Sequence, residues 1–182
     1  RQMIGSSALQ RQFNRLVYAT MIMLVIDACC WLIDGTTFPY ARTLNYALQT
    51  AYYVMHVLLP FFWALYVEVA LSTDLKAARR RLIIIAIPMA LLVAFLPFNI
   101  HLGYVFTIDA DNVYHRGVGF LIYGFMTYAF LIYASIRAMI KAKNSAWIDD
   151  RRSCYTMALF GVLPALGGVL QAFFYGLSLN WI

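Results

Sequence analysis

Four polar side chains interrupt long apolar stretches of this sequence, and their types and spacing could form a polar binding site. They are Asp27, His56, Asn99 and Gln171. Helical residues rise about 1.5 Å each, so the four lie about 18, 22, 27 and 25 Å from the basic end of their stretches. A charged side chain at mid-helix in lipid costs about 2.5–3.5 kcal/mol. We therefore expect one polar layer that contains all four residues.

Asp27 and His56 are the sharpest pair in this layer. A neighbouring carboxylate favours the imidazolium form of histidine, which would make the pair a proton-sensitive switch. A buried hydrogen-bonded pair that only fixes helix packing is the other interpretation. Aromatic residues at the same level could complete a small-molecule pocket open to the outside, or act as ordinary interfacial anchors. The predicted ligand-binding residues are Asp27, Trp31, Tyr52, His56, Asn99 and Gln171.

A second polar group lies just before residue 118, ahead of the fourth apolar stretch. It consists of Asp109, Asp111, His115 and Arg116. Such residues could form a lid that recognises a polar ligand, because binding residues often lie on loops held by a rigid scaffold. A plain solvated loop is the alternative.

Catalytic chemistry finds no support in the sequence. No lysine lies inside an apolar stretch to form a Schiff base, no HExxH motif or glycine-rich phosphate loop occurs, and the three cysteines have no metal-ligand spacing. Glu68 and Arg137 fall at one level of their stretches, where a structural ion pair is favoured over a catalytic role. We expect no catalytic residue, no metal and no cofactor, and we do not expect this chain to be an enzyme.

The elements that position these residues are predicted to be transmembrane helices. The chain is 63% hydrophobic and 12% charged, whereas soluble domains are about half apolar and a quarter charged. A span needs about 20 apolar residues. The fold class is therefore all-α, a polytopic transmembrane helix bundle of about five spans at residues 14–34, 43–71, 82–106, 118–140 and 154–178. Residues 1–13 form either a short interfacial helix or a linker on the cytoplasmic side.

The basic residues predict the orientation of the bundle. The net charge of +6 comes from Lys and Arg clustered before the first span and in the second and fourth loops, while the other two loops hold only Arg42 and Arg116. Short loops rich in Lys and Arg stay in the cytoplasm. We expect a multi-pass protein of the plasma or inner membrane, with the start of the chain inside, its end outside, and no nucleic-acid partner.

Short motifs are spread over nearly the whole chain. They are Asp27 with Trp31, Asp34-Gly35, Leu44-Asn45, Trp63 with Tyr66, residues 112–117 (Asn-Val-Tyr-His-Arg-Gly), Leu163-Pro164, Gln171 and residues 176–181 (Gly-Leu-Ser-Leu-Asn-Trp). In these motifs the chain resembles the membrane-embedded N-terminal region of bacterial seven-helix signalling proteins, which is fused to GGDEF diguanylate cyclases or to histidine kinases. The resemblance implies a sensor that relays a cue to a cytoplasmic output domain. One span before Arg1 and one after Ile182 would complete seven helices.

We therefore predict a membrane-embedded receptor for an extracellular or membrane-borne cue. The expected partners are the lipid membrane, an unidentified small molecule or a proton, a cytoplasmic output domain in the same polypeptide, and a second copy in a homodimer. The leading alternative is a small-solute transporter or channel, which proline-interrupted helices would suit, although no internal repeat is evident. A subunit that anchors a partner in the membrane is a third interpretation.

Overall fold

The computed structural model describes residues 4–72, 75–162, 164, 166 and 167. This part of the chain contains helices and one small antiparallel sheet. The elements are α1 (Ile4–Ile33), α2 (Ala41–Leu71), α3 (Leu75–Leu102), β1 (Phe106–Ile108), β2 (Tyr114–Arg116), α4 (Phe120–Lys143) and α5 (Ile148–Phe160).

Four helices, α1 to α4, are long and apolar enough to cross a membrane. They confirm the first four predicted helical stretches, with shifted ends. Helix α1 is continuous from Ile4, so the described part of residues 1–13 belongs to the same helix as the first predicted span. The fifth predicted span, residues 154–178, is described as helix α5 only as far as Phe160, and most of it lies outside the described residues.

Helix α3 ends earlier than predicted, at Leu102 rather than residue 106. Gly103 has a φ of 60°, a left-handed conformation that glycine adopts without steric cost, and its N–H donates to the Asn99 carbonyl. This is a common way for an α-helix to terminate. The residues that follow are therefore free to form a strand.

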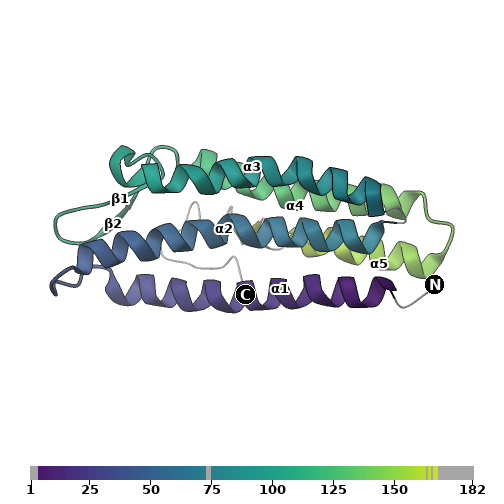
Figure 1. Ribbon diagram of the computed structural model, residues 1–182, viewed down its shortest axis with the longest axis horizontal. Helices are drawn as coiled ribbons and strands as arrows, with labels where there is room; N and C mark the ends of the chain where they lie inside the picture. Colours follow the sequence, from purple (N-terminus) through teal and green to yellow (C-terminus); the bar gives the residue numbers. More distant parts are fainter. Residues whose placement is uncertain (1–3, 73–74, 163, 165, 168–182) are drawn as a thin grey trace.

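Helix α2 is the centre of the bundle. It packs against α1, α3 and α4, while α5 packs against α4. Figure 1 shows the helices as a long bundle, with the hairpin formed by β1 and β2 projecting at one end. The α1–α2 turn lies at that same end, which we call the hairpin end. The opposite end, where α2 leads into α3, is called the Glu68 end.

Apolar side chains lie both inside the bundle and on its outer surface. Helix α2 buries a face of residues three and four apart, including Tyr53, Val57, Ala64 and Val67. Helices α1 and α3 instead expose large apolar side chains on the outside of the bundle, such as Leu91 at 67%. An apolar outer surface is typical of helices that face hydrocarbon.

Candidate functional site

The segment between α3 and α4, for which the sequence predicts a lid or a plain solvated loop, contains a β-hairpin. Strands β1 and β2 pair antiparallel, with Phe106 opposite Arg116 and Ile108 opposite Tyr114. Asn112, which has a φ of 61°, and Asp109 form the turn. The predicted outer-loop residues are therefore held in fixed positions.

An asparagine clamp fastens this hairpin to the ends of α1 and α2. Asn45 of α2, fully buried, donates through Nδ2 to Asn112 Oδ1 at 3.0 Å and to Asp34 Oδ1 at 3.2 Å. Asn112 Nδ2 donates to the carbonyls of Ile33 and Thr36 at 2.8 and 3.1 Å. These bonds satisfy the two Nδ2 donors, and leaving a buried polar group unpaired costs about 1–3 kcal/mol. Asn45 Oδ1 is buried without a hydrogen-bond partner among the described residues.

Strand β1 is held by three further side chains. Arg42 donates twice to the Ile108 carbonyl, at 2.8 and 3.2 Å, and the Tyr46 hydroxyl accepts from the Ile108 N–H at 3.2 Å. Asn99 donates to the Phe106 carbonyl at 2.9 Å and accepts from the Val105 N–H at 2.6 Å. Asn99 is buried as predicted for the polar layer, but both ends of its amide support the hairpin backbone.

Aromatic rings join the hairpin to the core of the bundle. Tyr53 of α2 stacks on Phe106 with ring centroids 5.1 Å apart, and its hydroxyl lies 2.6 Å from the hydroxyl of Tyr114. The Tyr123 hydroxyl of α4 donates to the Tyr53 carbonyl at 3.1 Å. The hairpin is thus packed against α2 on a surface that continues to α4.

The predicted recognition residues Asp109, Asp111, His115 and Arg116 divide into structural and surface positions. Asp109 Oδ1 accepts the N–H groups of Asp111 and Val113, at 3.0 and 2.8 Å, and Oδ2 lies 2.8 Å from His115 Nε2. The His115 hydrogen bond and these backbone bonds hold the pKa of Asp109 below its ordinary value. Arg116 lies over the Phe120 ring at 4.5 Å.

The middle of α2 carries His56 between two tyrosines. His56 is 9% exposed, and its ring centroid lies 5.6 Å from that of Tyr52 and 6.1 Å from that of Tyr128 of α4. The Tyr128 hydroxyl is buried and has no hydrogen-bond partner within the part of the chain that the structure describes. Of the six predicted ligand-binding residues, Tyr52 and His56 are therefore brought into contact.

The remaining predicted ligand residues lie elsewhere on the bundle. Met23 of α1 packs with Leu59 and the flanking Tyr52, so half-buried Asp27, one turn nearer the hairpin end, lies at the level of Tyr52. The Asp27–His56 pair stays a prediction. Trp31 is 57% exposed on the surface of the described bundle, and Gln171 lies outside the described residues.

Glu68 is the hub of an ionic network at the other end of α2. Its side chain is fully buried, and it accepts from Arg137 of α4 at 2.7 Å and from Arg81 of α3 at 2.8 Å. The Tyr133 hydroxyl donates to it at 2.7 Å, and Arg81 also donates to Ser72 Oγ at 3.3 Å. The predicted Glu68–Arg137 ion pair is present. One carboxylate therefore connects three helices.

Sequence reasoning missed three of the residues that matter most at the two ends. Arg81 belongs to a basic run in the second predicted loop, and the sequence gives no signal for Tyr133. Asn45 appeared only as part of a motif, although an asparagine inside an apolar stretch is a signal that a buried hydrogen bond is needed. Among the described residues, no group of three His, Cys, Asp or Glu side chains is placed to hold a metal ion.

Searches of protein-family models, of curated proteins and of solved structures found no match to this chain.

Proposed function

We propose that this chain is a membrane-embedded sensor module that recognises an extracellular or membrane-borne cue and relays it to a cytoplasmic signalling output. The observation that carries the proposal is the continuity of α2. This one helix of 31 residues, about 46 Å long, contacts the hairpin through Asn45, carries His56 at its middle and holds Glu68 in its last turn. A cue that shifts α2 therefore acts on both ends.

The distribution of charge supports an orientation with the hairpin outside the cell. The start of α1, the start of α3, the end of α4 and the start of α5 lie together at the Glu68 end and carry most of the Lys and Arg residues, whereas the hairpin end carries Arg42 and Arg116. Lys and Arg favour the cytoplasmic side. In a variant without native cysteines, we expect Ala110→Cys to react with an impermeant maleimide in intact cells and Ser145→Cys to react only after lysis. The reverse result would overturn this orientation.

The relay requires two packings of the bundle that differ in cue affinity. The hairpin is bonded to α1 and α2, and Glu68 connects α2 to α3 and α4. A change in the tilt of α2 at the His56 level would alter both sets of contacts. The cue site that we propose is the polar layer around His56, with Asp27 and Tyr52.

Spectroscopy on the chain in nanodiscs tests the relay. Spin labels at Arg11 of α1 and Lys143 of α4, both exposed at the Glu68 end, report the distance between these helices. We expect this distance to change when the pH is lowered stepwise, because protonation gives an imidazole a charge, or on adding one of a panel of small polar solutes. Asp27→Asn and His56→Ala should abolish the change, whereas His101→Ala, an exposed histidine on α3, should retain it.

A constant distance under all conditions would contradict the relay. The competing function, a small-solute transporter or channel, predicts flux of the effective solute through proteoliposomes. Solute flux that disappears in His56→Ala would replace the sensor by a transporter. A distance change without flux would support the sensor.

The output partner is proposed from the resemblance to sensor regions of GGDEF diguanylate cyclases and histidine kinases. We expect the reading frame after the Ile182 codon to encode a further span and one of these two domains in the same polypeptide. A reading frame that encodes neither domain would remove this part of the proposal and leave the relay to be judged on the spin-label distances.

A further inference from the structure

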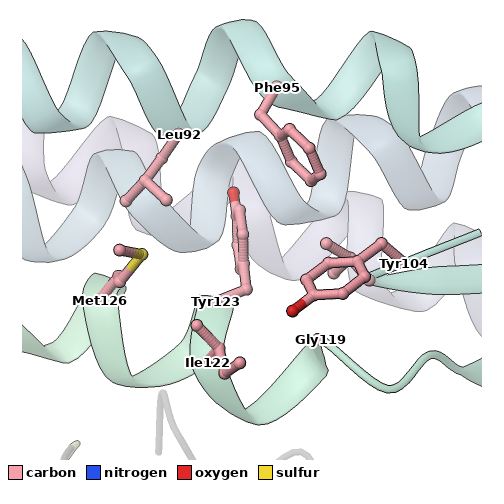
Figure 2. Close-up of a pocket in the computed structure, with 8 residues that line it drawn as sticks. Leu92, Phe95, Tyr104, Gly119, Ile122, Tyr123 and Met126 are labelled. Atoms are coloured by element: carbon pink, nitrogen blue, oxygen red, sulfur yellow. The ribbon is translucent and has the colours of Figure 1, made fainter. Parts of the chain in front are cut away.

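A groove separates the outer faces of α3 and α4 near the hairpin end. Helix α3 packs mainly on α2 and only sparsely on α4. The resulting space has a volume of about 180 Å³. Figure 2 shows its lining, with Leu92 and Phe95 projecting from α3 toward Ile122, Tyr123 and Met126 of α4.

The lining selects a hydrocarbon occupant. No charged side chain is among the described residues that line the groove, and its floor is formed by buried Val105 and Tyr123. The Tyr123 hydroxyl already donates to the Tyr53 carbonyl, so the floor is apolar toward the groove. Water in such a space would lack the two to four polar partners that it requires. A hydrocarbon chain would find contacts on every side.

The depth of the groove matches one leaflet of a bilayer. Leu92 lies ten residues from Leu102, where α3 ends, which is about 15 Å along the helix. Met126 lies six residues from Phe120, where α4 begins, which is about 9 Å. Half of a hydrocarbon core is about 15 Å thick. The groove therefore reaches about the depth of one leaflet along α3 and about 9 Å along α4.

Tyr104 closes the groove toward the hairpin. Its ring packs so closely on Gly119 that a Cβ at this glycine would overlap it, and it meets the Phe95 ring edge-on at 6.3 Å. Ile122 and Met126 on the α4 side are 53% and 51% exposed. An occupant therefore enters sideways, between the helices, from the surface that faces hydrocarbon.

We propose that this α3–α4 groove binds one acyl chain of a phospholipid from the leaflet at the hairpin end. Lateral entry suits a chain already in the bilayer. No cationic residue is among the described residues of the lining, which favours a neutral ester over the carboxylate of a free fatty acid. The inference rests on the membrane placement proposed above, but not on the relay.

A bound chain would also stabilise the base of the hairpin. Tyr104 and Val105 precede β1, and Gly119 follows β2. The backbone bonds from Gly117 N–H to the Val105 carbonyl and from Gly119 N–H to the Tyr104 carbonyl, both 2.8 Å, close the hairpin at this point. A bound acyl chain would therefore contact residues on both sides of these two hydrogen bonds.

Photolabelling in nanodiscs tests the proposal directly. The probe is a phosphatidylcholine with a diazirine halfway along one acyl chain, and the adducts are mapped by mass spectrometry. If the groove binds the acyl chain specifically, we expect severalfold more adduct on half-buried Leu92 and Phe95 than on Leu91 and Phe125, which are 67% and 70% exposed. Adducts in proportion to exposure would overturn the proposal.

Groove-filling variants give an independent measurement. Leu92→Trp should reduce labelling of Met126 severalfold, whereas its matched control Leu91→Trp, one residue away on the exposed face, should not. Ile122→Phe fills the groove from the opposite wall by a smaller change. It should also reduce labelling of Met126, and it serves as the test variant if Leu92→Trp does not fold. Unchanged Met126 labelling in a folded, filled variant contradicts the site.

Competition separates the two sources of an acyl chain. Unlabelled phosphatidylcholine should reduce the adducts at Leu92, and oleate at equal chain concentration should not. Competition by oleate alone would overturn the phospholipid assignment. Failure of the chain to enter nanodiscs would instead overturn the membrane placement, so the two failures are distinguishable.

Discussion

The hairpin end and the Glu68 end of α2 hold their partners by different chemistry. At the hairpin end, amide, hydroxyl and charged side chains bond largely to backbone groups, as Asn99 and Arg42 do to the carbonyls of Phe106 and Ile108. At the Glu68 end, one buried carboxylate bonds the charged side chains of α3 and α4. The first end fastens an accessory element, and the second connects the helices themselves.

The energies of the two kinds of contact differ accordingly. A neutral hydrogen bond contributes about 0.5–1.5 kcal/mol net, and bonds to one small element can be released without separating the helices. Removing one partner of a buried ion pair costs about 3–5 kcal/mol, because the other charge stays behind without compensation. We therefore expect substitutions at the hairpin end to act locally, and those at the Glu68 end to act on the whole bundle.

Glu68→Gln should have the largest effect. It leaves the guanidinium groups of Arg81 and Arg137 without their carboxylate, and we expect the free energy of unfolding to fall by about 3 kcal/mol. Equilibrium unfolding in mixed SDS micelles measures this. Arg79→Gln, an exposed arginine on the same helix as Arg81, is the matched control and should change the value by less than about 0.5 kcal/mol. Equal effects would mean that the network does not stabilise the bundle.

Asn112→Ala should release the hairpin while leaving the helices assembled. The substitution removes the bonds to Ile33, Thr36 and Asn45 and places a Cβ-bearing residue without a polar side chain at a φ of 61°. We expect a local loss of about 2–3 kcal/mol, of which about 1 kcal/mol reflects the left-handed backbone. Limited proteolysis of residues 104–118 should accelerate, with little change in global unfolding.

Asn112→Gly separates the two contributions to that loss. Glycine accepts the positive φ but lacks the amide, so cleavage should fall between that of the wild type and that of Asn112→Ala. Identical cleavage in all three proteins would show that the clamp does not hold the hairpin.

The helices were predictable because their signal is local and long. A span of about 20 apolar residues stands out in any sequence, and Glu68 and Arg137 were matched because helical rise converts residue counts into depth. The hairpin lacked both advantages. Its strands have three residues each, and Phe106 and Ile108 continue the apolar stretch of α3, so only the left-handed Gly103 separates them.

The candidate site is harder to predict from the sequence than the hairpin, because its contacts join residues that are far apart in the chain. Asn45 bonds to Asn112, 67 residues away, and neither side chain indicates the other by spacing. In the sequence, Arg81 forms one basic run with Arg79 and Arg80. Its bond to Glu68 depends on its position on α3, which the run does not indicate. The depth of His56 can be counted from the sequence because helical rise is regular, whereas the pairing of its side chain depends on tertiary packing.

Tyr53→Phe should have a smaller effect at the hairpin end. It removes one hydrogen bond, the 2.6 Å contact with the Tyr114 hydroxyl, and keeps the ring stacked on Phe106. We expect a loss of about 1 kcal/mol, which is a factor of about 5 in the open population of the hairpin. Proteolysis of the hairpin measures it, and Tyr46→Phe provides a comparison because that hydroxyl bonds to Ile108. A loss as large as that of Asn112→Ala would show that the stacked rings also rearranged.

The smallest effect is expected from acid at the Asp109–His115 pair, which lies at the solvent-exposed tip of the hairpin. Since folding lowers the pKa of Asp109, its carboxylate stabilises the turn above its ordinary pKa of about 3.9, and this contribution is lost as the pH falls through the lowered value. The Val113 N–H donates to Asp109 Oδ1, so its nitrogen shift in ¹⁵N-valine-labelled protein reports the titration. We expect a midpoint below about 3.9, moved upward in His115→Ala because the hydrogen bond to Oδ2 is removed. An unchanged midpoint in that variant would leave the backbone N–H groups as the sole cause of the lowered pKa, and the tip would then be uncoupled from His115.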